Sequence, residues 1–125
     1  MFEIIIFILI SFLLLFYILR WSTNRNVECI SIAESYQIFL DEDAFFIDVR
    51  TEEEYKNGSI KQSINIPIEK IKDRIGEIPE DKTIITFCHS GHRAYEAYNI
   101  FRNKGFEVYV LDANIYDIID FYSSI

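Results

Sequence analysis

The chain has 125 residues and a formal net charge of −8, from 12 Lys and Arg residues and 20 Asp and Glu residues. That length suits one domain of about 100–150 residues and argues against a two-domain enzyme with a cleft between its lobes. The acidic balance argues against nucleic-acid binding, and a composition that is 50% hydrophobic argues against a disordered chain. Two cysteines are too few for a disulfide-stapled scaffold.

The N-terminal segment is much more apolar than the rest. Residues 4–19 contain no charged side chain, and Glu3 and Arg20 flank them. A membrane-spanning helix needs about 17–25 apolar residues, so residues 1–21 are predicted to form a transmembrane anchor. A cleaved signal peptide is disfavoured because no Lys or Arg precedes the run and no small-residue cleavage site follows it. A buried helix this apolar on every face would need a far larger protein around it.

The charges beside this segment predict its orientation. Arg20 and Arg25 follow the apolar run, and only the N-terminal amine precedes it. The positive-inside rule therefore predicts a single-pass protein whose C-terminal domain is cytoplasmic. Because the cytoplasm is reducing, Cys29 and Cys88 are expected to be free thiols. Residues 22–26 are predicted to be a polar linker.

Residues 27–125 are predicted to form one soluble domain, with ten basic and nineteen acidic residues and thus a charge of −9. Short apolar segments alternate with helical patterns. Capping boxes at Ser31–Glu34 and Thr51–Glu54 predict two helix starts. The predicted strands are 27–30, 45–49, 63–66, 83–87 and 107–111, and the predicted helices are 31–40, 51–58, 68–75, 93–104 and 115–122. This alternation predicts an α/β fold with a mostly parallel central sheet of about five strands and helices on both faces.

The loop between strand 83–87 and helix 93–104 carries the clearest chemical signal. In parallel sheets, ligands bind at the carboxyl ends of strands, where helix N-termini attract anions, and such a setting favours the thiolate form of Cys88. Gly91 permits a tight curl of the backbone, and Arg93 can hold an oxyanion with two parallel donors. The loop therefore predicts a thiolate nucleophile that attacks an anionic substrate.

The other candidate residues carry weaker signals. His89 and His92 are expected to line the loop mouth and add polar contacts or positive potential when protonated, or else to point into solvent. A metal site at Cys88, His89 and His92 is disfavoured because adjacent residues rarely chelate one ion and no fourth ligand has a suitable spacing. No metal or cofactor is predicted. Cys29 lacks any comparable setting and is expected to be a core or inert residue.

Four segments, in order, carry a resemblance to a known family. Residues 46–55 resemble the IDVR-x-x-x-E-[FY] signature of rhodanese-like domains, and residues 88–93 are similar to that family's C-R-S-G-x-R active loop. Residues 58–67 and 104–111 resemble two further motifs of the family. The similarity covers about residues 28–123, which is nearly all of the predicted soluble domain.

The resemblance implies a sulfurtransferase. Cys88 would attack the outer sulfur of thiosulfate or a persulfide donor, and the resulting Cys88 persulfide would be passed to a thiol acceptor, either a small molecule or a protein. Asp48 and Arg50 have mainly structural roles in the family, and Arg50 is one candidate partner for a buried Asp48. The implied donor-binding residues are those of the loop: His89, Ser90, Gly91, His92 and Arg93.

The sequence departs from the family pattern at several positions. Ser59 replaces the histidine of a G-H-I motif, and His89 stands where the family often has arginine, which weakens the positive field of the loop. The pair of glycines and the tryptophan that the family has after its last strand are absent from this sequence. Asn114 can still adopt a left-handed turn there, so the fold is expected to be kept.

Two other functions remain open. Cysteine phosphatases and arsenate reductases of a related type have a C-x5-R loop, whereas Cys88 and Arg93 form a C-x4-R loop. That smaller ring of amides suits a sulfur atom better than a phosphate. The other alternative is a non-catalytic docking or sulfur-relay module.

Overall fold

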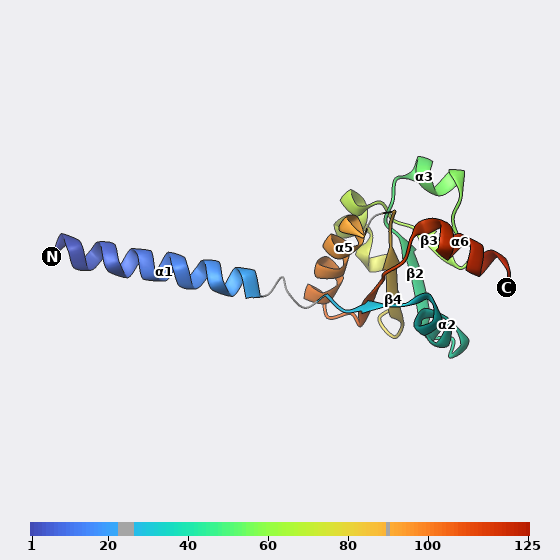
Figure 1. Ribbon diagram of the computed structural model, residues 1–125, viewed down its shortest axis with the longest axis horizontal. Helices are drawn as coiled ribbons and strands as arrows, with labels where there is room; N and C mark the ends of the chain where they lie inside the picture. The colour runs from blue at the N-terminus through green and yellow to red at the C-terminus, as the bar shows by residue number, and fades with distance from the viewer. Residues whose placement is uncertain (23–26, 90) are drawn as a thin grey trace.

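The computed structural model of the protein describes residues 1–22, 27–89 and 91–125. Its centre is a parallel five-stranded sheet with the order β1-β5-β4-β2-β3 (Figure 1). The strands are β1 Cys29–Ile30, β2 Ala44–Asp48, β3 Ser63–Asn65, β4 Thr83–Phe87 and β5 Val108–Leu111. The predicted strand number and parallel arrangement are therefore confirmed. β4, the middle strand, is buried along its whole length.

Helices cover both faces of the sheet, as predicted (Figure 1). One face packs against α2 (Ile32–Leu40) and α6 (Ile115–Ser123) in a core that includes Phe46 and Phe87. The other face packs against α4 (Ile71–Arg74) and α5 (His92–Asn103) in a second core. The residues of α5 that the periodicity placed on one face are all buried: Ala94, Ala97, Tyr98 and Phe101.

Both predicted capping boxes are present. Ser31 caps α2, and Thr51 caps α3 (Glu52–Asn57), each accepting a bond from the backbone of a glutamate three residues later. Each glutamate side chain accepts a bond from the capping residue's own N–H in return. Such caps satisfy backbone donors that a helix cannot pair internally, which is why these two helix starts are readable from sequence.

Two local predictions were wrong. The segment 68–75 is not one α-helix: a 3-10 turn, η1 (Ile68–Lys70), precedes α4, and another, η2 (Ile75–Glu77), follows it. Its isoleucines still face the core, because tight turns of three residues also bring residues at this spacing to one side. Asn114 is not left-handed. It is extended, and its side chain caps α6 by accepting a bond from the N–H of Tyr116 at 2.8 Å.

The two cysteines are both free, but they differ in exposure. Cys88 is buried and Cys29 is exposed. A core position for Cys29 is therefore wrong, because β1 is a two-residue strand at the edge of the sheet. The Cys29 thiol lies 3.9 Å from the hydroxyl of Tyr95 on α5.

The N-terminal segment forms one long helix, α1 (Phe2–Ser22). Its stretch Phe2–Arg20 has a mean hydropathy of 2.9, and none of it is buried against the rest of the chain. This helix is long and apolar enough to cross a membrane. Residues 23–26, which make up most of the predicted linker, lie outside the described residues.

Candidate active site

Cys88 lies directly after β4, at the carboxyl end of the central strand of the sheet. Its sulfur accepts hydrogen bonds from the backbone N–H groups of Gly91, at 3.0 Å, and Ala94, at 3.4 Å. Gly91 has a φ of +85°, a left-handed conformation that glycine adopts without steric cost. This turn aims the first amides of α5 at the sulfur, an arrangement that stabilises a negative charge there.

The histidines of the loop both lie at the surface. His89 is exposed and packs edge-on against the ring of Tyr116, with ring centroids 5.9 Å apart. His92 is the first residue of α5 and is also exposed. Ser90, the remaining predicted loop residue, lies outside the described residues. The structure thus brings His89 into contact with α6.

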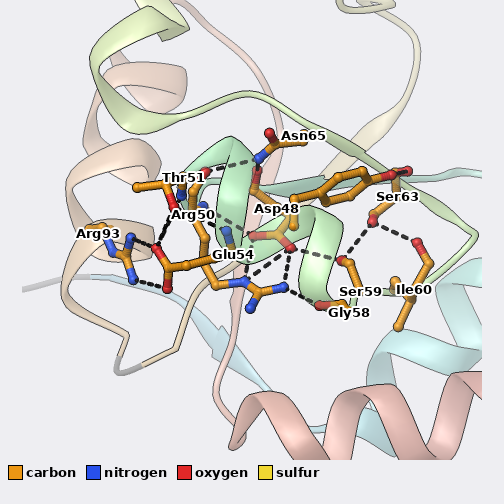
Figure 2. Close-up of polar contacts among 11 residues, drawn as sticks. Asp48, Arg50, Thr51, Glu54, Gly58, Ser59, Ile60, Ser63, Asn65 and Arg93 are labelled. Carbon is orange, nitrogen blue, oxygen red and sulfur yellow. Dashed lines mark hydrogen bonds and ion pairs between the residues drawn. The ribbon is translucent and has the colours of Figure 1, made fainter.

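Arg93 is paired with Glu54 of α3, a contact that the sequence reasoning missed (Figure 2). Nη1 of Arg93 lies 2.6 Å from Oε1 of the glutamate, and Nη2 lies 3.0 Å from Oε2. These bonds from Arg93 are the main reason that the pKa of Glu54 is lowered to about 2. The sequence contained one signal for this pair, since Glu54 belongs to the family-like signature as well as to the capping box.

A buried ion pair between Asp48 and Arg50 stabilises the segment between β2 and α3, just before Glu54 (Figure 2). Asp48, at the end of β2, is fully buried and accepts bonds from the backbone N–H of Arg50 at 3.0 Å and from its Nη2 at 2.7 Å. Ser59 donates a further bond of 2.7 Å to the same carboxylate. Arg50 also donates to the carbonyl of Gly58 at 2.7 Å. These contacts join the two ends of α3 and so fix the helix that carries Glu54.

A cleft of about 310 Å³ opens beside the loop, between α3 and α6. We call it the α3–α6 cleft. His89 forms the part of its lining that belongs to the Cys88 loop. The α6 wall is mainly apolar, and the opposite wall is mainly polar. The α6 wall consists of Ile115, Tyr116 and Ile119, and the opposite wall of Arg50, Glu54, Asn57 and Gly58. No sequence pattern predicted this cleft, because its two walls come from segments that are far apart in the chain.

The family model for the rhodanese-like domain matches residues 31–119. The chain belongs to the rhodanese-like family. Its central parallel sheet, covered by helices on both faces, agrees with this assignment. The Cys88 loop lies inside the matched segment, whereas α1 lies outside it.

Individual relatives of this rhodanese-like chain include enzymes of sulfur transfer. It is 34% identical over 65 residues to a sulfurtransferase of Allochromatium vinosum, covering 52% of this chain and 61% of that protein. It is 30% identical over 85 residues to the thiosulfate sulfurtransferase PspE of Escherichia coli, covering 66% of this chain and 80% of that protein. The chain thus spans less than two thirds of the Allochromatium protein's length.

The fold of the rhodanese-like domain also matches solved structures. A rhodanese-related protein from Thermoplasma volcanium superimposes with a TM-score of 0.66 at 27% identity. The superposition covers 74% of this chain and 91% of that one.

Proposed function

We propose that this rhodanese-like domain, residues 27–125, transfers sulfane sulfur through a persulfide on Cys88. The observation that carries the proposal is the position of the Cys88 sulfur. It lies at the carboxyl end of the central strand, where two backbone N–H groups donate to it. Preorganised donors of this kind favour a thiolate and the anionic persulfide that follows it.

The proposed reaction has two displacements. The Cys88 thiolate attacks the outer sulfur of thiosulfate, the S–S bond of the donor breaks, and its electron pair leaves with sulfite. The product is an anionic persulfide, Cys88–S–S⁻. An acceptor thiolate then attacks the outer sulfur of this persulfide, and its S–S bond breaks to return the Cys88 thiolate. No metal or cofactor is needed in either step.

We assign the remaining predicted site residues to two groups. Asp48 and Arg50 support the loop structurally by fixing α3 through their buried ion pair. The donor-binding group is the rest of the loop, in which Gly91 contributes a backbone N–H and Arg93 contributes a charge already shared with Glu54. That group comprises His89, Ser90, Gly91, His92 and Arg93.

The apolar helix α1 supports a further part of the proposal, that residues 1–21 anchor the domain in a membrane. Arg20 and Arg25 follow the apolar run, so the positive-inside rule favours a cytoplasmic domain. The short segment between α1 and β1 would then keep the domain close to the membrane.

Mass spectrometry of the purified chain after incubation with thiosulfate tests the catalytic proposal. We expect a gain of one sulfur atom, located on Cys88 by peptide mapping and absent from Cys88→Ser. Cys29→Ser is the matched control and should load normally. If the parent chain gains no sulfur and forms no thiocyanate with cyanide, the catalytic proposal is wrong and the docking alternative is favoured.

A further inference from the structure

The α3–α6 cleft shares a wall with the Cys88 loop, so its chemistry bears on the donor. His89 follows Cys88 directly in the chain and lines the cleft. A volume of about 310 Å³ lies at the lower end of the range of about 300–1,000 Å³ found for small-molecule sites. The cleft can therefore hold the part of a donor that lies beyond its reacting sulfur.

The α6 wall of the cleft is apolar and partly open to solvent. Tyr116 is 69% exposed although its side chain is large and mostly apolar. Ile115 and Ile119 flank it on the same helix. Gly58, across the cleft, comes close enough that a methyl group there would lie 3.8 Å from Ile119 Cδ1. These side chains offer contact area to an apolar ligand group rather than to a small anion.

The charged groups of the opposite wall are already paired within the fold. Among the described residues lining the cleft, Arg50 is the one Lys or Arg side chain, and it is bound to Asp48. Glu54 is bound to Arg93 and also accepts from Thr51. A dianion such as thiosulfate would therefore find no unpaired guanidinium among these residues. It would also enter the field of a domain with nine excess negative charges, which repels anions.

On the basis of the proposed function, we propose that the α3–α6 cleft binds the apolar group of an organic sulfane-sulfur donor, and that such donors are preferred over thiosulfate. The reaction at Cys88 is unchanged in kind. With benzenethiosulfonate, the thiolate attacks the outer sulfur, the S–S bond breaks, and the electron pair leaves with benzenesulfinate. The product is again the anionic Cys88 persulfide. The phenyl group rests against Tyr116 and Ile119.

The test compares two donors of equal charge and different apolar area, benzenethiosulfonate and methanethiosulfonate, with thiosulfate as the dianionic reference. The protein is the full chain in detergent, and transfer to cyanide is measured. We expect kcat/KM to be at least about tenfold higher for the phenyl donor than for the methyl donor, the scale of a small apolar group fitting a pocket. Thiosulfate should have the lowest kcat/KM of the three.

Variants locate the effect in the cleft. Tyr116→Ala and Ile119→Ala should each reduce the phenyl-to-methyl ratio by severalfold, mainly through KM for the phenyl donor. Leu40→Ala removes an exposed apolar side chain at the end of α2 and should leave the ratio unchanged. Benzenesulfinate, the product, should inhibit the parent chain more strongly than Tyr116→Ala.

The measurements distinguish a wrong assignment of the cleft from an absence of sulfur transfer. The cleft assignment would be overturned if all three donors load Cys88 at similar kcat/KM and if Tyr116→Ala leaves the phenyl-to-methyl ratio of kcat/KM unchanged. The protein would still be a sulfurtransferase in that case. A preference for thiosulfate over both organic donors would overturn it as well. If no donor loads Cys88, both proposals are wrong.

Discussion

The guanidinium of Arg93, at the start of α5, is bound through both Nη atoms to the carboxylate of Glu54 on α3. The two residues are 39 positions apart, and their side chains are 28% and 34% exposed. The pair joins the helix behind the Cys88 loop to the helix that lines the cleft. The carboxylate of Glu54 also offsets the positive charge that Arg93 gives to the loop. The pair therefore affects both the stability of the fold and the preference for a sulfur donor.

The Glu54–Arg93 pair should make the protein acid-sensitive in a defined range. The pKa of Glu54 is lowered from an ordinary value of 4.5 to about 2. Its contribution to the free energy of unfolding is therefore complete above about pH 4.5 and is lost as the pH falls through 2. In urea unfolding at pH 7, the free energy of unfolding of Glu54→Gln should be about 1 kcal/mol lower than that of the parent chain. This difference should disappear near pH 2. Glu53→Gln, at an exposed position on the same helix, is the control and should follow the parent at each pH.

The same variant should change the response to thiosulfate. Glutamine preserves the capping box but releases the charge of Arg93, so the loop gains positive potential. We expect kcat/KM for thiosulfate to rise about fivefold, which corresponds to about 1 kcal/mol. Sulfur transfer to cyanide measures it, and the gain should shrink at high salt. A fall in kcat/KM would mean that Glu54 is needed to position the loop.

The Gly91 turn should be required for chemistry as well as for folding. Alanine at φ +85° costs about 1–2 kcal/mol of stability and shifts the N–H that donates to Cys88. Gly105→Ala is a matched control, because Gly105 has a φ of +90° and open space around it. We expect both variants to be destabilised to a similar extent, with slower persulfide loading of Cys88 only in Gly91→Ala. Equal loading rates would exclude a role for this amide.

The buried Asp48–Arg50 pair should be one of the most sensitive positions in the fold. Asp48→Asn leaves a buried guanidinium without its counter-charge, a change that costs about 3–5 kcal/mol. Ser59→Ala removes one bond to the carboxylate and should cost about 1.5–3 kcal/mol. Denaturant unfolding measures both. A loss below 1 kcal/mol in Asp48→Asn would show that water or rearrangement compensates for the missing charge.

Deletion of residues 1–22 should release the protein from membranes. The full chain should stay in the pellet after a high-pH carbonate wash, whereas the truncated chain should appear in the supernatant and still load Cys88. N-terminal sequencing of the membrane-bound protein gives a second readout. A terminus after the apolar run would identify a cleaved signal sequence and contradict the anchor.

Local signals in the sequence were sufficient for much of the fold. The bonds of the two capping boxes span three residues, and the buried face of α5 follows from helical spacing alone. The position of Cys88 between a buried strand and a helix was also predicted, because both flanking elements have strong patterns of their own. The break of segment 68–77 into tight turns was not predicted, since similar apolar spacings suit both helix types.

The sequence by itself determined most element types, the parallel sheet and the loop that carries Cys88, because these depend on contacts between near neighbours and on periodic burial. Only the tertiary structure decided the partners of the charged groups. Glu54 meets Arg93 because the order of the strands places β2 next to β4 and so brings α3 beside the loop. The α3–α6 cleft likewise exists only once α6 returns to the end of the sheet where α3 lies. Contacts of this kind join residues far apart in the chain, and no local spacing encodes them.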